Sequence, residues 1–234
     1  MGLHPCLASV SLVVQMKAGN EIGTATGFFY KRNEQLFLIT NNHVCRYDQK
    51  AVIPDTLRLN LHTDQSDVRK SGNYDIPLYA GGTPLWRNPP SSPTADVAVI
   101  ELDPGIRQQF LVNHWEANDF LPNNFPLHPG EDVFLMGYPH GFHDEVHNLP
   151  VFRNAMIAST FRVPFEGSPA FVTDGNLLPG MSGSPVLTKP KSVWVDDQGN
   201  SNLLTGTRYY LLGVHSGTYS VWDSPTGQAP PGPS

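Results

Sequence analysis

Charged residues are scarce in this chain. Only 15% of its 234 residues are Asp, Glu, Lys or Arg, and the formal net charge is −6. The sequence has no cluster of Lys and Arg, which argues against a nucleic-acid-binding surface. It also lacks an apolar run long enough to cross a membrane as a helix. We therefore expect neither nucleic acid nor a membrane among the partners of this protein.

The N-terminal residues lack the pattern of a secretory signal. They carry no basic segment, and Ser9 and Ser11 interrupt the apolar run at 7–14. The chain has only two cysteines, Cys6 and Cys45, which are too few for a secreted disulfide scaffold. These absences predict a cytoplasmic location. A bridge between the two cysteines stays open as an alternative.

Turn-forming residues are abundant, with 22 Pro and 21 Gly. Between them lie short segments that are apolar throughout or alternate between apolar and polar residues, as at 56–62. This combination predicts many short strands joined by loops. The segments that we expect to form strands are 7–16, 21–30, 36–40, 56–62, 75–79, 96–102, 132–137, 152–161, 170–172, 184–188, 193–195 and 209–214.

The expected strands fall into two series, which predicts an all-β fold of two packed barrels. We expect one domain over 1–223, followed by a Pro- and Gly-rich tail at 224–234 that is disordered. Within the domain we expect an N-terminal barrel at about 7–103, a crossover at about 104–130 and a C-terminal barrel at about 131–223. The crossover carries four prolines and has no strand pattern.

A histidine and an aspartate stand in settings that suit acid–base catalysis. His43 follows the apolar run 36–40, so a strand end would fix the imidazole and leave it open to a cleft. Asp96 opens the apolar run 97–100, where a partly buried carboxylate needs a partner such as an imidazole N–H. Taken alone, each residue also fits a simpler role, as a polar loop histidine or as a strand cap.

Ser182 lies in a glycine-flanked turn that suits a nucleophile. Glycines at 180 and 183 let the backbone turn sharply, so the N–H groups of Gly180 and Ser182 would point together at a developing oxyanion. A serine becomes nucleophilic when an imidazole takes its proton and a carboxylate orients that imidazole. The chain supplies these groups in the order His43, Asp96, Ser182. The alternative is a Gly/Ser turn with no chemistry.

Five segments resemble, in order, the motifs of trypsin-like (chymotrypsin-fold) serine peptidases. The resemblance extends over about 7–221 and is nearest to bacterial members. It implies two six-stranded antiparallel β-barrels of the chymotrypsin type with the active site in the cleft between them. It also implies a serine endopeptidase with no cofactor and no metal. The segments are Thr24-Ala25-Thr26-Gly27-Phe28-Phe29, Thr40-Asn41-Asn42-His43-Val44, Asp96-Val97-Ala98-Val99-Ile100, Gly180-Met181-Ser182-Gly183-Ser184-Pro185 and Leu212-Gly213-Val214-His215-Ser216-Gly217.

The resemblance implies roles for residues around the triad. Gly180 and Ser182 would form the oxyanion hole, and Ser216 would pair with a protein or peptide substrate in extended form. His215 resembles the pocket histidine of glutamyl endopeptidases, which contacts a Glu or Gln side chain, whereas Leu177 fits an apolar P1 side chain. Both preferences stay open. The residues assigned to substrate binding are Asn176, Leu177, His215, Ser216, Gly217 and Thr218.

Departures from the family keep other functions open. Asn176 stands where peptidases selective for Lys and Arg have Asp, and the chain has no Ile-Val-Gly-Gly segment for zymogen activation. We therefore expect another restraint on activity, such as a regulatory protein partner. The alternatives are a catalytically latent binding module of the same fold and a small-acyl esterase or amidase. The spacing of His140, His143 and His147 would suit zinc on a helix, but we expect a solvated loop there.

Overall fold

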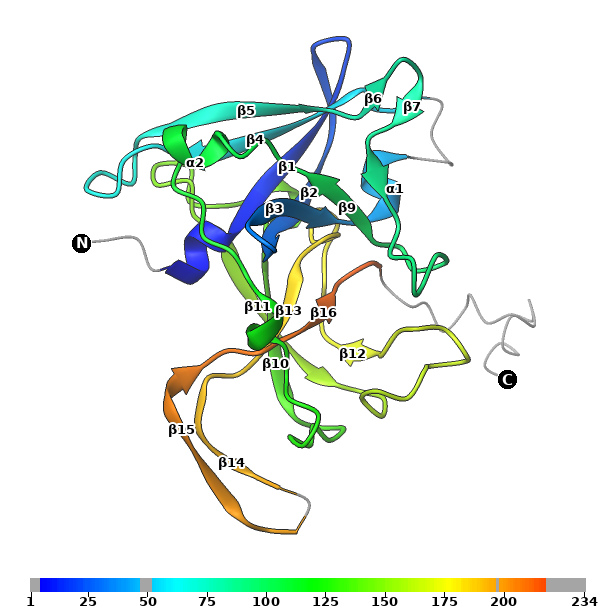
Figure 1. The fold of residues 1–234 in the computed structure, drawn as a ribbon, viewed down its shortest axis with the longest axis vertical. Helices are drawn as coiled ribbons and strands as arrows, with labels where there is room; N and C mark the ends of the chain where they lie inside the picture. The colour runs from blue at the N-terminus through cyan, green and yellow to red at the C-terminus, as the bar shows by residue number, and fades with distance from the viewer. Residues whose placement is uncertain (1–4, 47–51, 197, 218–234) are drawn as a thin grey trace, which may run out of the picture.

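The structure, a computed structural model, describes residues 5–46, 52–196 and 198–217. Most of the strands belong to two antiparallel sheets, one in each half of the chain (Figure 1). The N-terminal sheet consists of β1 (Val10–Lys17), β2 (Asn20–Arg32), β3 (Gln35–Thr40), β4 (Thr56–His62), β5 (Ser71–Pro77), β8 (Trp86–Arg87) and β9 (Ala98–Glu101). Its strand order is β5-β4-β1-β2-β3-β9-β8.

The C-terminal sheet has the strand order β12-β11-β10-β13-β16. Its strands are β10 (Asp132–Gly137), β11 (Val151–Ile157), β12 (Thr173–Asp174), β13 (Pro185–Thr188) and β16 (Leu211–Val214). Two further pairs are β6 (Tyr79–Ala80) with β7 (Thr83–Pro84), and β14 (Lys191–Val195) with β15 (Ser201–Arg208). The second pair projects from the body of the C-terminal half as a long hairpin (Figure 1).

The helices are short. They are η1 (Pro5–Ser9), α1 (Asn42–Cys45), α2 (Ile106–Gln109), η2 (Ala117–Asp119) and η3 (Pro139–Gly141). No helix in the described part of the chain is long and apolar enough to span a membrane.

Two tight hairpins show how the sequence sets the register of the N-terminal sheet. Ala18 and Gly19 join β1 to β2, and Asn33 and Glu34 join β2 to β3; all four residues have positive φ. A two-residue loop with both residues in this region forms a type I′ turn, whose twist matches that of the paired strands. These loops therefore fix the register of β3, which ends just before the predicted catalytic histidine.

Three clusters of buried apolar side chains form the core. One fills the N-terminal sheet and includes Leu57 and Leu59, the alternating residues of β4. A second fills the C-terminal half around Met181. A third joins the two sheets, with Phe28 from β2 against Met136 from β10. Each buried side chain of this size contributes about 1.5–3 kcal/mol. The third cluster holds the halves together, so residues from both can meet at one site.

The all-β architecture predicted from the sequence is confirmed, with differences in detail. The sheets have seven and five strands rather than six each, and neither closes through strand pairing within the described ranges. Residues 170–172 form no strand, and β11 ends at Ile157; in the segment between, Arg162 and Glu166 adopt left-handed backbone conformations. Residues 201–208 form a strand that was not predicted. The tail 224–234 lies outside the described residues.

Candidate active site

His43 and Asp96, the predicted base and acid, lie in direct contact. His43 belongs to α1, directly after β3, and Asp96 lies two residues before β9, the strand that pairs with β3. The Nδ1 atom of His43 is 2.6 Å from Oδ2 of Asp96, and the backbone N–H of His43 donates to Oδ1 at 3.0 Å. Both carboxylate oxygens therefore bind the same residue, which fixes the orientation of the imidazole ring.

The surroundings of Asp96 keep it ionised. Burial raises the pKa of its carboxyl, but the hydrogen bonds and the charge of His43, with the backbone N–H of Asn42, outweigh burial and hold the pKa below its usual value. A carboxylate at Nδ1 selects the neutral tautomer whose Nε2 accepts a proton. The pair is therefore arranged as a general base requires.

Two asparagines that the sequence analysis did not identify brace this pair. Asn41 is fully buried, and its side-chain N–H donates to the backbone carbonyl of Asp96 at 2.7 Å. The side-chain oxygen of Asn42 accepts a hydrogen bond from the Trp86 indole at 2.8 Å. A signal was present in the sequence, because two amides placed between a buried strand and His43 must find hydrogen-bond partners.

Ser182 lies on a turn that hydrogen-bonds to the N-terminal sheet. The N–H of Thr26 in β2 donates to the Ser182 carbonyl at 2.8 Å, and the Thr40 hydroxyl in β3 donates to the Thr26 carbonyl at 2.8 Å. Since Thr40 is three residues before His43, one strand pair supports both segments. Gly183, with φ of 86°, would place a Cβ atom 2.0 Å from the Thr26 carbonyl oxygen, so only glycine permits this approach.

The turn before Ser182, residues 178–181, holds its backbone in one orientation; we call it the oxyanion turn. The Met181 N–H donates to the Leu178 carbonyl at 3.1 Å, and Gly180 has a φ of 91°, as expected for a type II turn with Pro179 at its second position. The Pro179 carbonyl accepts from the His140 N–H at 2.6 Å. Because C=O and N–H of a trans peptide point in opposite directions, the Gly180 N–H faces away from His140.

The N–H groups of Gly180 and Ser182 have no hydrogen-bond partner within the described residues. Gly180 and Ser182 are both half-buried, and neither N–H is used within the described fold. Glycine is again required at position 180, where a Cβ atom would lie 2.5 Å from the Tyr138 carbonyl oxygen. Two unused donors beside a serine are what stabilisation of an oxyanion requires.

A cavity of about 1140 Å³ reaches Asp96 and extends along β16, but His43, Gly180 and Ser182 are not among its lining residues. Its lining includes Asp96 and four of the residues assigned to substrate binding, namely Leu177, His215, Ser216 and Gly217. Asn176 is not part of the lining, and its carbonyl accepts a hydrogen bond from Arg153 at 2.6 Å. Thr218 lies outside the described residues.

The segment 158–175 supplies much of the remaining wall, which sequence reasoning did not assign. Phe161 and Phe171 line the cavity and meet edge to face, with ring centroids 5.0 Å apart. The Arg162 guanidinium donates to four backbone carbonyls of the crossover, those of Leu121, Pro122, Asn123 and Phe125. These bonds hold the aromatic wall in place, although the segment has no helix or strand before the two-residue strand β12.

His215 connects the cavity to the turn of the nucleophile. Its carbonyl accepts from the Gly183 N–H at 2.8 Å, and its N–H donates to the Ser184 carbonyl at 2.9 Å. Burial, and then the charge of nearby His43, lower the pKa of His215 to about 4. The ring is therefore neutral at pH 7 and presents one N–H donor and one acceptor.

The remaining sequence candidates have separate roles. Cys6 and Cys45 are buried and form no disulfide. The Nδ1 atom of His143 lies 2.6 Å from the Gly141 carbonyl oxygen, and His147 pairs with Asp144. Across the described part of the chain, no three His, Cys, Asp or Glu residues are grouped so that they could hold a metal ion.

The chain is similar to known proteins over a range that includes His43, Asp96 and Ser182. The family of trypsin-like peptidase domains matches this chain over residues 25–194. The chain also matches the crystal structure of the serine endoprotease from Yersinia pestis, with 16% sequence identity and a TM-score of 0.48. The alignment covers 91% of this chain and 63% of that protein, so the chain spans less than two thirds of its length. A comparison with curated protein sequences finds no match.

Proposed function

Because the chain belongs to the family of trypsin-like peptidase domains, we propose that it is a serine endopeptidase that works through an acyl-enzyme intermediate. The observation that carries this proposal is that the segments of His43 and Ser182 are both held by the paired strands β2 and β3. The His43–Asp96 pair is hydrogen-bonded through both carboxylate oxygens, and two unused backbone N–H groups belong to the turn of the serine.

In this mechanism Ser182 attacks the scissile carbonyl while Nε2 of His43 takes the hydroxyl proton. Asp96 stays ionised and stabilises the imidazolium that forms. The tetrahedral intermediate then collapses, and His43 returns the proton to the leaving amine. Water then attacks the acyl-enzyme while Nε2 of His43 takes its proton. When the second tetrahedral intermediate collapses, His43 gives this proton to Ser182 and the free hydroxyl is regenerated.

The N–H groups of Gly180 and Ser182 bind the oxyanion in both tetrahedral intermediates. One such donor contributes about 2.7–4 kcal/mol to the lowering of the barrier. The type II turn orients the Gly180 peptide before substrate arrives, so reorganisation during the reaction is small. This preorganisation favours an active peptidase over a latent binding module.

The substrate is a peptide segment bound in extended form beside β16, with Ser216 supplying backbone contacts. Its P1 side chain enters the cavity, where the neutral ring of His215 donates to a Glu or Gln side chain. The walls formed by Leu177, Phe161 and Phe171 accept an apolar side chain instead. A measurement of the P1 preference would show whether His215 or the apolar walls dominate the pocket.

The test is cleavage of a diverse peptide library by the wild-type protein and by Ser182→Ala, with both proteins shown to be folded. We expect cleavage by the wild type only, together with labelling of Ser182 by a fluorophosphonate. Labelling and ester turnover without peptide cleavage would favour the esterase alternative. A folded wild-type protein that neither cleaves nor becomes labelled would refute the proposed activity and favour a binding module.

A further inference from the structure

The loop between β10 and β11, residues 138–150, connects the oxyanion turn to the opposite half of the molecule. At its start, the His140 N–H binds the Pro179 carbonyl. At its far end, residues 144–149 fold into a compact turn that contacts β4 of the N-terminal sheet. We call residues 144–149 the docking turn. No feature of the sequence assigned a role to this contact.

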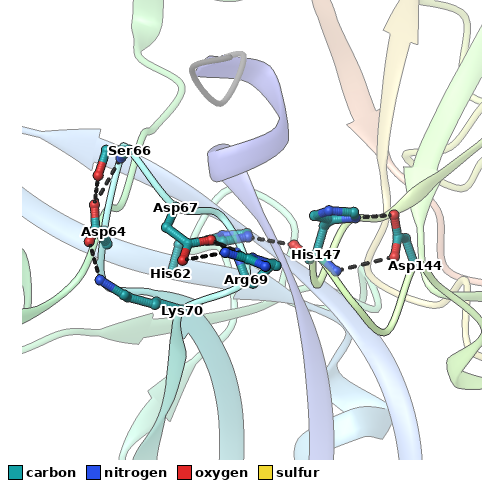
Figure 2. Close-up of polar contacts among 8 residues, drawn as sticks. All are labelled: His62, Asp64, Ser66, Asp67, Arg69, Lys70, Asp144 and His147. Atoms are coloured by element: carbon teal, nitrogen blue, oxygen red, sulfur yellow. Dashed lines mark hydrogen bonds and ion pairs between the residues drawn. The ribbon is translucent and has the colours of Figure 1, made fainter.

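Two hydrogen bonds of opposite direction, each donated by a buried side chain, fix the docking turn on β4. The Nε2 atom of His62, the last residue of β4, lies 2.8 Å from the His147 carbonyl oxygen (Figure 2). The Asn148 side chain donates to the carbonyl of Asn60 at 2.9 Å. His62 is 5% exposed and Asn148 6%. Loss of either bond therefore leaves a buried side-chain donor unpaired.

Internal hydrogen bonds stiffen the docking turn. The docking turn is closed by reciprocal backbone hydrogen bonds between Asp144 and Leu149, and the Asp144 carboxylate binds both the backbone N–H and the Nδ1 atom of His147. Opposite it, the β4–β5 hairpin carries the partly exposed ion pairs Asp64 with Lys70 and Asp67 with Arg69, which contribute little to its stability (Figure 2). The docked turn therefore acts as a fixed anchor for the loop.

The start of the loop needs such an anchor. His140 has φ of 52° and ψ of 25°, a left-handed conformation that costs a non-glycine residue about 1–2 kcal/mol. The segment is held at one end by Tyr138, which is buried and whose N–H donates to the Thr26 hydroxyl at 3.1 Å. Downstream of His140, the docking turn provides the contacts with the N-terminal sheet described above.

The orientation of the Pro179–Gly180 peptide depends on this segment. A four-residue turn keeps its closing hydrogen bond, here from Met181 to Leu178, in either type I or type II form, and the two forms differ by a flip of the central peptide. The His140 N–H selects the form observed. Without that bond the peptide can flip, and the Gly180 N–H then points to the opposite side of the turn.

We propose that His62 and Asn148 are positioning residues for the oxyanion turn, and that docking of residues 144–149 on β4 holds the Gly180 N–H ready to bind the oxyanion. The inference rests on the proposed peptidase activity. It adds that the N-terminal sheet contributes to catalysis through the loop as well as through His43 and Asp96.

The test compares His62→Phe, which keeps a ring of similar size without a donor, with His62→Gln, which restores an N–H donor. For His62→Phe we expect kcat on a peptide substrate to fall about ten- to a hundredfold with KM within about threefold, a fraction of the loss of a whole oxyanion donor. Amide hydrogen exchange should rise in 138–142 and in 178–182. His62→Gln should recover most of both changes.

Arg69→Gln is the matched control, since it removes an exposed charge of the same hairpin that does not touch the docking turn. It should leave kcat and exchange unchanged. An unchanged kcat in His62→Phe, or exchange that rises in 144–149 alone, would overturn the proposal. Hydrogen exchange needs no turnover, so a failure of the coupling remains distinguishable from a failure of the proposed activity.

Discussion

Replacing Thr26 by Val should damage both stability and catalysis, because one buried hydroxyl joins three segments of the site. The Thr26 hydroxyl donates to the Gly180 carbonyl at 2.8 Å and accepts from the Tyr138 N–H at 3.1 Å, and Thr26 is fully buried. Valine has nearly the same shape, so no cavity forms. The unpaired Tyr138 N–H costs about 1–3 kcal/mol and the lost bond to Gly180 about 1 kcal/mol. We therefore expect a total loss of about 2–4 kcal/mol.

Urea denaturation followed by tryptophan fluorescence measures the free energy of unfolding, and Thr26→Ser, which keeps the hydroxyl, is the control. We also expect kcat in Thr26→Val to fall while KM changes little, because the oxyanion turn loses the hydrogen bond to its Gly180 carbonyl. A loss of less than about 0.5 kcal/mol, or equal losses in the Ser and Val variants, would refute this reasoning about the hydroxyl.

Three further predictions follow from the site. Asp96→Asn should keep the fold and lower kcat about ten-thousandfold at pH 7, because the amide favours the wrong tautomer of His43; circular dichroism and steady-state kinetics check this. Gly183→Ala should lower stability in urea by more than about 2 kcal/mol, since left-handed backbone and a contact at 2.0 Å with the Thr26 carbonyl oxygen combine. Because the pKa of His215 is lowered to about 4, the unfolded chain takes up a proton between about pH 6.5 and 4 that the native state does not. The native state should therefore lose stability as the pH falls from about 6.5 to 4. The loss should be less steep in His215→Gln.

Much of the fold could be predicted because local patterns determine it. The alternation in β4 and the apolar run of β3 fixed two strands within a residue of their observed bounds, and the turn residues around Gly19 and Asn33 lie where the hairpins turn. The family motifs brought the separate segments of the candidate site into one hypothesis. Periodicity alone would have left His43, Asp96 and Ser182 as polar residues of loops.

What the sequence did not reveal depends on contacts between distant segments. The aromatic wall at 158–172 forms no strand, and the bonds of Arg162 to crossover carbonyls hold it in place. The docking of His147 on His62 joins residues 85 positions apart through a backbone carbonyl, which any residue type supplies. In the sequence Asn41 is only one member of the motif around His43. Its role was not predicted because it depends on where the fold places Asp96.

Alkylation of the two buried thiols can report when the native structure opens. Burial raises the pKa of Cys45 strongly, with a further contribution from the Asp96 charge, and burial raises the pKa of Cys6 to about 11. A thiol reacts with alkylating reagents as the thiolate, so neither side chain reacts while the native packing persists. Cys45 lies two residues after His43, and Cys6 packs where the two sheets meet. The alkylation rates at the two thiols would therefore report two separate events, exposure of helix α1 and separation of the two sheets.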